Sequence, residues 1–291
     1  MHGIGQRRPR CMFGDLVVAA CLVASMLGTA QAQAQAPGLG ASVELVDPKV
    51  FRVCADPRNL PFSDQAGEGF ENKLAELFAA KLGKSVSYTY FPQIVGFYRN
   101  TLNAFRCDVV MGVPSGSDLV QTTIPYYHTI YELVVRPNTG LDEVETLADP
   151  RLREKRIGIV AGTPPATIMA EAGLMAKAKP YPLMIDTRHD SSTKEMIDDL
   201  LAGRIDAAIL WGPIAGYYIE HAGTPLKAIP LAKDQGEVPM DFRIAMGVRR
   251  SDQEWRRTLN RLIKENQEAI NTILLSYSVP LLDDEGKLIK P

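Results

Sequence analysis

The sequence is poor in cysteine and histidine, with four of each among its 291 residues. It has no G-x-S-x-G, H-E-x-x-H, P-loop or complete G-x-G-x-x-G motif, the patterns typical of serine hydrolases, zinc proteases and nucleotide-binding enzymes. His128, His189 and His221 stand far apart in the chain, and surface or hydrogen-bonded histidines are the interpretation we favour for them. We therefore expect a protein that is not an enzyme and that holds no metal or other cofactor of its own.

Clustered basic residues are also missing. The chain carries 32 Lys and Arg against 34 Asp and Glu, and no basic patch with interleaved aromatic residues occurs. This balance excludes a nucleic-acid partner. One stretch, from Cys107 to Val135, has no Lys or Arg at all, although it contains the loop of small residues at 112–118.

Spanning a membrane takes about 18 consecutive apolar residues. No apolar run beyond the N-terminus reaches that length. Three arginines at positions 7, 8 and 10 precede an apolar run at 16–27 and the repeat TAQAQAQA at 29–36. This order predicts a secretory signal peptide within residues 1–36, cleaved after position 32, 34 or 36. We expect the mature protein to be exported and to have no membrane span.

Two other interpretations of the leader fit less well. The run VVAAC at 17–21 resembles a lipoprotein cleavage box, but Asp15 interrupts the preceding apolar run and the hydrophobic stretch continues past Cys21. Arg7 and Arg8 resemble a twin-arginine signal, but the residues PRCMF that follow fit that pattern poorly.

Removing the leader leaves Cys54 and Cys107. Two cysteines in an oxidising compartment favour one disulfide, and two buried free thiols are the alternative. Because the leader holds three Arg and one Asp, its loss changes the net charge from −2 to −4.

Strands alternate with helices along the mature chain, which predicts an α/β fold with mainly parallel sheets. The expected strands are 51–55, 85–91, 107–112, 129–136, 156–162, 181–186, 206–211 and 242–248. The expected helices are 71–82, 97–105, one from 164, one at about 193–202, one from 213, and 253–275. Breaker-rich segments at 137–149 and 233–239 divide the pattern into two units.

Strand-end loops of two such units would face one another across a cleft, because the carboxyl ends of parallel strands carry the binding loops. We expect the cleft to take residues from the loops at 56–64, 112–118, 162–166 and 211–213. The candidate ligand or partner residues are Asn59, Leu60, Phe62, Glu71, Gly112, Val113, Pro114, Ser115, Gly162, Thr163, Trp211 and Gly212. Turn formation, helix capping and core packing are the competing explanations for these residue types.

The stretch FRVCADPRNLPFSDQAGEGFENKLAELFAAKLG resembles the first strand, site loop and first helix of type II periplasmic solute-binding proteins. The segments DVVMG, PYY, IGIVAGT and LAGRIDAAILWGPIAGYY match later landmarks of that family in order. The resemblance implies two lobes, the first at 49–136 and 240–291 and the second at 140–232. It also implies a hinge of two crossings, at 136–140 and 232–240, that lets the lobes close on a ligand.

Amino-acid binders of this family usually place an Arg just after the loop that corresponds to Gly112–Ser117, where it holds the ligand carboxylate. Here Asp118, Leu119 and Val120 follow instead. Those binders also carry an acid at the end of the second-lobe strand, where this chain has Trp211. An amino-acid ligand is therefore not expected.

Longer strings narrow the resemblance. The segments CADPRNLPFS, GEGFENKLAE, GFYRNTLNAFRCDVVMGVPSG, TTIPYY and ILWGPIAGYY resemble the J protein of methanol oxidation clusters, the MxaJ/XoxJ type. That resemblance implies an accessory role in the periplasm beside a PQQ methanol dehydrogenase, of the lanthanide or calcium type, and its cytochrome c. A small-molecule ligand remains open, and the alternative function is an ABC-transporter substrate-binding protein for a small solute that is not an amino acid.

Overall fold

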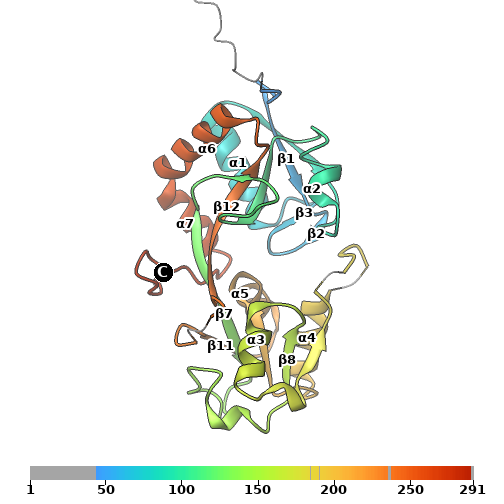
Figure 1. The fold of residues 1–291 in the computed structure, drawn as a ribbon, viewed down its shortest axis with the longest axis vertical. Coiled ribbons are helices and arrows are strands. Elements are labelled where there is room, and N and C mark those ends of the chain that lie inside the picture. The colour runs from blue at the N-terminus through green and yellow to red at the C-terminus, as the bar shows by residue number, and fades with distance from the viewer. Residues whose placement is uncertain (1–43, 184, 190, 235–236, 290–291) are drawn as a thin grey trace, which may run out of the picture. The chain divides into compact units, whose positions relative to one another are not determined.

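The computed structural model describes residues 44–183, 185–189, 191–234 and 237–289 (Figure 1). The predicted signal peptide at 1–36 lies outside these residues. The strands are β1 (Val50–Ala55), β2 (Arg58–Asn59), β3 (Ser63–Asp64), β4 (Ser85–Tyr90), β5 (Val109–Pro114), β6 (Gln121–Thr122), β7 (Tyr127–Val135), β8 (Ile157–Val160), β9 (Lys179–Tyr181), β10 (Ala207–Trp211), β11 (Lys227–Pro230) and β12 (Asp241–Val248). The helices are α1 (Phe70–Leu82), α2 (Phe97–Asn100), α3 (Pro164–Glu171), α4 (Ser192–Leu201), α5 (Gly212–His221), α6 (Gln253–Glu265) and α7 (Gln267–Leu275), with 3-10 turns η1 (Pro150–Leu152) and η2 (Met175–Lys177).

Ten of the twelve strands form one mixed sheet in the order β4-β1-β5-β12-β7-β10-β8-β9, with β6 paired to β12 and β11 paired to β7. Strands β2 and β3 pair with each other in a separate two-stranded sheet. In the first lobe β4, β1 and β5 are parallel, and in the second lobe β9, β8 and β10 are parallel. The antiparallel members are β12, β7, β11 and β6. This arrangement confirms the predicted α/β class and the mainly parallel core of each lobe.

Two strands pass from one lobe to the other, as Figure 1 shows for β7 and β12. Strand β7 pairs with β12 over Tyr127–Ile130 and then with β10 over Tyr131–Val135. Strand β12 begins at Asp241, opposite Ile130. We therefore propose the lobe boundary between Ile130 and Tyr131 and at 240–241. The boundary in β7 lies earlier in the chain than the predicted crossing at 136–140. The reason is that β7, the strand expected to end lobe 1, pairs with strands of both lobes.

The first helix shows how the sequence sets the lobe 1 core. The Asn72 side chain at the start of α1 accepts the backbone N–H of Gly69, and Gly83 ends the helix in the left-handed conformation at φ 63°. Phe70, Leu74 and Phe78 lie on one face with no exposed surface. They pack against the sheet in one core cluster with residues of α6 and α7. The apolar face that the sequence spacing predicts for α1 is therefore the face turned to the core.

The predicted disulfide is confirmed. Cys54 at the end of β1 is bonded to Cys107, which precedes β5, and the two Cα atoms are 5.5 Å apart. Because β1 and β5 are neighbouring parallel strands, the bridge links two adjacent strands of the same sheet. Both cysteines are buried in a small core cluster with Phe97 and Leu102.

Several boundaries differ from the sequence-based expectation. The helix expected over 253–275 is divided at Asn266, whose side-chain amide donates to the Leu262 carbonyl at 2.8 Å and whose backbone leaves the helical region. An asparagine that bonds the local backbone in this way competes with the helical ladder. The helix expected over 97–105 ends at Asn100. In place of the strand expected over 181–186 the structure has β9 at Lys179–Tyr181, which shares only Tyr181 with the expected range.

Candidate functional site: a cavity between the lobes

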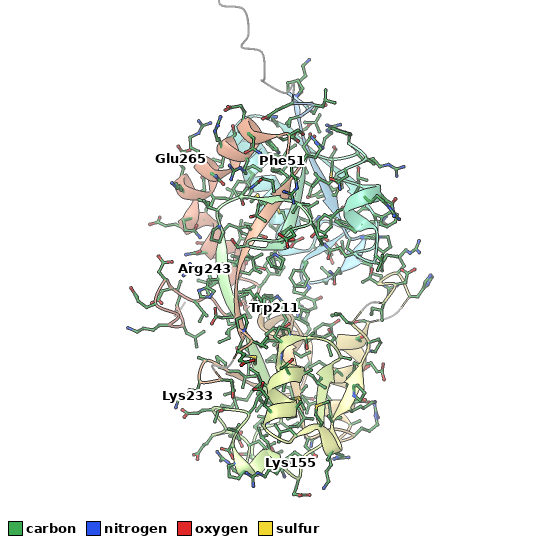
Figure 2. The ribbon with its side chains drawn as sticks, viewed as in Figure 1. Phe51, Lys155, Trp211, Lys233, Arg243 and Glu265 are labelled. Atoms are coloured by element: carbon green, nitrogen blue, oxygen red, sulfur yellow. A yellow bond between two sulfur atoms is a disulfide. The ribbon has the colours of Figure 1, made fainter. Side chains whose placement is uncertain are left out.

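A cavity of about 1240 Å³ lies between the two lobes, and both contribute to its wall. Lobe 1 supplies the loop after β1 and the end of β5, whereas lobe 2 supplies the start of α4, the end of β10 and one face of α5. Trp211, labelled in Figure 2, lies between the lobes, well away from Glu265 on α6 and from Lys155 at the far end of lobe 2. The arrangement confirms that strand-end loops of the two lobes face a common space.

Three aromatic side chains form what we call the aromatic cluster of the cavity: Tyr131, Trp211 and Phe242. The ring centroids of Tyr131 and Trp211 are 4.9 Å apart, and those of Trp211 and Phe242 are 5.8 Å apart. Burial raises the pKa of Tyr131 to about 12, so its hydroxyl stays protonated at neutral pH. The cluster gives the cavity an apolar wall of rings in tilted and edge-to-face contact, which suits an apolar or aromatic group.

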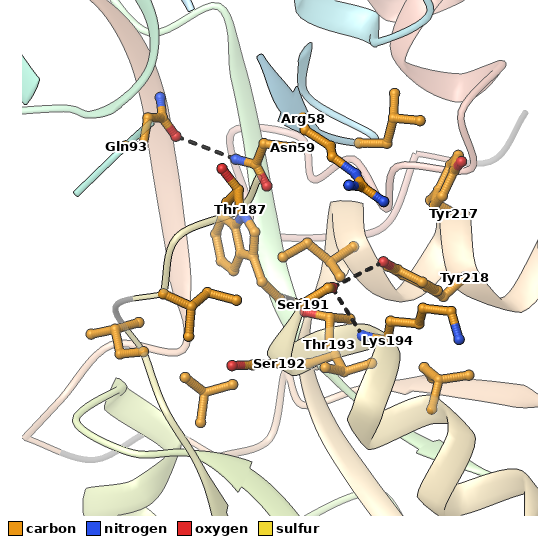
Figure 3. Close-up of a pocket in the computed structure, with 18 of the residues that line it drawn as sticks. Arg58, Asn59, Gln93, Thr187, Ser191, Ser192, Thr193, Lys194, Tyr217 and Tyr218 are labelled. Atoms are coloured by element: carbon orange, nitrogen blue, oxygen red, sulfur yellow. Dashed lines mark hydrogen bonds between the residues drawn. The ribbon is translucent and has the colours of Figure 1, made fainter. Parts of the chain in front are cut away.

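Hydroxyl groups line the opposite wall. Ser191 is the N-cap of α4 and its Oγ accepts the Lys194 backbone N–H at 3.1 Å. The Tyr218 hydroxyl on α5 lies 3.3 Å from the same Oγ (Figure 3). Lys194 reaches Asp198 with its ammonium group, 2.6 Å away, so this positive charge is already paired. The outer wall is therefore polar but close to neutral.

Arg58 brings a cation to the cavity; it lies in the predicted loop at 56–64 but was not among the candidate residues. Its Nη1 donates to the Arg188 carbonyl at 3.0 Å, and no carboxylate among the described residues pairs with it. Figure 3 shows the guanidinium projecting toward the space in front of Tyr218. A positive group therefore reaches the cavity from the first loop and not from the segment at 107–135, which has no Lys or Arg.

Half of the predicted site residues line the cavity. They are Asn59, Leu60, Gly112, Pro114, Thr163 and Trp211. Asn59 donates from its side-chain amide to the Gln93 side chain at 3.3 Å, as drawn in Figure 3. Thr163 precedes α3, but its hydroxyl donates to the Val160 carbonyl at 2.7 Å and does not cap the helix.

The other half do not line the cavity. Phe62 packs against the lobe 1 core, with its ring centroid 5.3 Å from that of Phe70. Val113 has no exposed surface, because alternate residues of β5 face the core cluster around the disulfide. Gly212 stands where a Cβ atom would lie 2.4 Å from both the Ile130 carbonyl oxygen and Pro280, so it allows a close backbone approach. Ser115 and Gly162 also fall outside the lining, with Ser115 donating its N–H to the Arg243 carbonyl.

Glu71, the remaining predicted residue, lies directly behind the cavity floor. A Cβ atom placed on Gly112 would come within 2.5 Å of the Glu71 Oε1, so only glycine leaves room for this carboxyl. No described residue donates a hydrogen bond to it, and burial, reinforced by the charge of Asp56, raises the pKa of Glu71 to about 8. The cavity floor therefore rests on a carboxyl that is protonated at neutral pH.

Sequence reasoning missed the residues that β7 and β12 supply. Tyr131 and Phe242 were assigned to strands, but β7 and β12 line the cavity at these positions, where they pass from one lobe to the other. Tyr217 and Tyr218 were also missed, although they follow Trp211 in the quoted stretch ILWGPIAGYY. Their distance from Pro213 could have indicated them. Pro213 lies in the first turn of α5, which starts at the cavity, and both tyrosines follow it by one turn or more.

The rim opposite the crossing strands is bridged by hydrogen bonds between the lobes. The Thr187 hydroxyl of lobe 2 lies 2.8 and 3.0 Å from the two carboxylate oxygens of Asp56 in lobe 1. Asp56 has no exposed surface and also accepts the backbone N–H groups of Arg58 and Gln93, at 2.9 and 2.8 Å. The Arg58 to Arg188 contact lies beside this bridge.

Two α/β lobes joined by two crossing strands, with a cavity that both lobes line, define a periplasmic-type binding protein. No family model matches the chain. The periplasmic binding protein XoxJ of Methylobacterium extorquens AM1 is 38% identical, covers 80% of this chain and 100% of its own, and superposes with a TM-score of 0.69. The chain belongs to the family of this protein.

Two further relatives agree with that assignment. MxaJ from Methlophaga aminisulfidivorans MPT is 26% identical over 80% of this chain and 100% of its own, with a TM-score of 0.69. Protein MoxJ of Methylorubrum extorquens is 27% identical over 96% of this chain and 97% of its own. Amino-acid-binding proteins at 19–22% identity, with TM-scores of 0.54–0.63, share the fold alone.

Two further observations concern the described residues. Within the described ranges, no helix combines the length and the apolar character that crossing a bilayer requires. The same residues contain no group of three or more His, Cys, Asp or Glu side chains arranged to hold a metal ion.

Proposed function

We propose that this protein is a periplasmic accessory protein of a PQQ-dependent methanol dehydrogenase system, of the lanthanide or calcium type, and that it assists maturation or activation of the dehydrogenase. Family membership with XoxJ supports the setting. The proposal assigns the protein a binding role without turnover. A turnover assay with alcohols, added PQQ and cytochrome tests this, and substantial activity of the chain alone would contradict it.

The observation that carries the proposal is the size and lining of the cavity. Sites for small molecules usually enclose about 300–1,000 Å³, whereas this cavity measures about 1240 Å³. Its aromatic cluster accepts an apolar group, and its hydroxyl-lined wall offers partners for a backbone or polar side chain. These dimensions and chemistry fit an apolar side chain of the dehydrogenase or its cytochrome c together with the chain on either side of it.

The test is a titration of this protein with the cognate dehydrogenase and, separately, with the cytochrome c, followed by calorimetry. Trp211→Ala and Phe242→Ala should each weaken binding by at least tenfold, because central aromatic residues dominate interface energies. The matched control is Glu265→Gln, an exposed position on α6 away from the cavity. Circular dichroism should show that all three variants keep the native fold.

Two outcomes would contradict the partner role. One is the absence of binding to both proteins at micromolar concentration. The other is a loss of affinity in Glu265→Gln as large as that in Trp211→Ala, which would move the interface to the outer face of lobe 1.

The second candidate is a transport receptor for a small solute that is not an amino acid. Arg58 favours it, because a guanidinium without a carboxylate partner in the described chain can bind an acidic solute. Melting temperatures measured with a panel of carboxylic acids and amino acids at millimolar concentration separate the two functions. A rise with a carboxylic acid, combined with no binding to the dehydrogenase or cytochrome, would favour transport.

A further inference from the structure

We propose that residues 56–58 and 185–189 form an interlobe latch, which holds the two lobes closed by groups of this chain alone. The latch consists of two adjacent hydrogen-bonded bridges, from Thr187 to Asp56 and from Arg58 to Arg188. Both lie on the rim of the cavity opposite β7 and β12, so they fasten the side that must separate when the lobes rotate about the crossing strands.

The lobe 1 half of the latch is fixed before the lobes meet. Asp56 ends its strand and accepts the N–H groups of Arg58 and Gln93, which lie in the same lobe. The Ser63 hydroxyl also donates to the Asp56 backbone carbonyl at 2.9 Å. These contacts hold the Asp56 carboxylate in place and leave it able to accept a further hydrogen bond. A hydroxyl is a strong partner for it, because a hydrogen bond to an ionised group is stronger than one between neutral groups.

The lobe 2 half is fixed by its own contacts. The Arg188 guanidinium donates to both oxygens of Asp186, and the Arg188 backbone N–H lies 3.1 Å from Asp186 Oδ1. This ion pair turns the chain around Thr187, and the hydrogen bonds from Arg188 hold the pKa of Asp186 below its usual value, at about 2. The segment therefore presents one hydroxyl and one carbonyl toward lobe 1 in a shape that does not depend on an occupant of the cavity.

Opening the lobes breaks both bridges and leaves the Asp56 carboxylate to water or to a new donor. An occupant that brings a hydroxyl or amine donor to Asp56 would replace Thr187 and keep the carboxylate hydrogen-bonded. In most two-lobed binding proteins the ligand supplies the contacts that favour closure, whereas here the chain supplies two of them itself. The latch thus makes closure the resting state and makes entry to the cavity the step that an occupant must drive.

The experiment measures the distance between spin labels on the two lobes by double electron–electron resonance. The labels go on Lys81→Cys, which is exposed in α1, and on Lys155→Cys, which is half-buried at the far end of lobe 2, in the otherwise native protein. The unsubstituted latch should give one dominant short distance. Thr187→Val, which keeps the side-chain shape and removes the hydroxyl, should raise the ratio of open to closed molecules by about tenfold or more, the loss of one hydrogen bond to a charged group.

Three further variants complete the test. Thr187→Ser should restore the closed distance, because it keeps the hydroxyl. Arg58→Met should also open the lobes, by a smaller factor, since the bond it removes goes to a neutral carbonyl. Thr193→Val is the matched control: Thr193 lines the same cavity and has no hydrogen bond to lobe 1 among the described residues, so its variant should keep the closed distance.

The latch is overturned if the native protein gives mainly the long distance, or if Thr187→Val and Arg58→Met both leave the distribution unchanged. It is also overturned if Thr193→Val opens the lobes as much as Thr187→Val. None of these results depends on the identity of the partner. If the dehydrogenase does bind the cavity, Thr187→Val should raise its association rate constant, and a failure of that result alone would count against the proposed partner and not against the latch.

Discussion

The two lobes share an α/β plan but are held together by different means. Lobe 1 has a disulfide and a group of buried charges in which Asp108, with no exposed surface, pairs with Arg249 and Arg52. Lobe 2 has no disulfide among its described residues, and its main charged group surrounds Asp199, whose partners Lys179 and Arg204 are 41% and 58% exposed. The comparison indicates that lobe 1 is the more strongly fixed frame and that lobe 2 resists unfolding chiefly by apolar packing.

The largest expected effect comes from the buried charges of lobe 1. Arg249 Nη2 lies 2.7 Å from Asp108 and 2.6 Å from Asp252, and both carboxylates are fully buried. Arg249→Met leaves two buried carboxylates without their shared cation, which should lower the free energy of unfolding by about 3–5 kcal/mol. Urea denaturation measures the change. Arg243→Met is the control, because Arg243 pairs with the exposed Asp284, and it should cost no more than about 0.5 kcal/mol.

The disulfide should come next. Reducing or replacing Cys54 and Cys107 releases a cross-link between residues 53 positions apart, which should lower the free energy of unfolding by about 2–4 kcal/mol. The loss should fall on lobe 1: hydrogen exchange should speed up in β1 and β5 and stay unchanged in β8 and β10. Equal acceleration in both lobes would show that they unfold as one unit and would remove the distinction drawn above. Two titratable thiols in freshly purified protein would contradict the bridge itself.

The pH response is the point at which the lobes are alike. Burial raises the pKa of Glu71 in lobe 1 and of Glu132 on β7 to about 8 each. A raised folded-state pKa means that the folded protein holds the proton more tightly than the unfolded chain does. Each group's contribution is therefore complete below about pH 4.5 and is lost as the pH rises toward about 8.

For Glu71 we expect the free energy of unfolding to fall by about 2 kcal/mol between pH 5 and pH 7, relative to Glu71→Gln. Denaturation curves of the native protein and the variant at both pH values give the difference. Glu132→Gln should behave in the same way. A parallel pH response of native protein and variant would mean that water reaches the carboxyl and that its pKa is near the usual value.

The smallest expected effect is in lobe 2. Hydrogen bonds from Lys179 and Tyr181 hold the pKa of Asp199 well below its usual value. Since the cationic partners are open to solvent, Asp199→Asn should lower the free energy of unfolding by only about 1 kcal/mol. A loss as large as that of Arg249→Met would show that exposure of the partners does not weaken the group, and the contrast between the lobes would fail.

Much of the fold could be predicted from residues alone, because apolar spacing and breakers act locally. The buried face of α1 follows from Leu74 and Phe78, and its end follows from Gly83, which needs a left-handed backbone. The disulfide followed from the number of cysteines left in the mature chain and from their strands. The break at Asn266 was missed because the apolar spacing is the same whether or not an asparagine side chain bonds to the backbone of its own helix.

The site was predicted only in part, and the reason is geometric. Thr163 and Trp211 line the cavity as predicted, because parallel strands carry their binding loops at their carboxyl ends. The positions of those ends follow from the strands that the sequence predicts. Tyr131 and Phe242 were missed because their exposure to the cavity depends on where β7 and β12 change partners. Phe62 and Gly212 lie outside the lining of the cavity, because loop position does not reveal which neighbour a residue will pack against.

The sequence by itself determined the α/β class, the two lobes, the family and the cysteine pair, since each depends on local patterns or on long matching strings. Only the tertiary structure decided that Arg58 brings a cation to the cavity, that Glu71 is buried behind Gly112, and that Thr187 reaches Asp56 across the rim. The positions 56 and 187 are 131 residues apart, and no local pattern specifies their contact. Burial and distance between remote segments are properties of the packed chain, and they set both the pKa of a carboxyl and the partner of a hydroxyl.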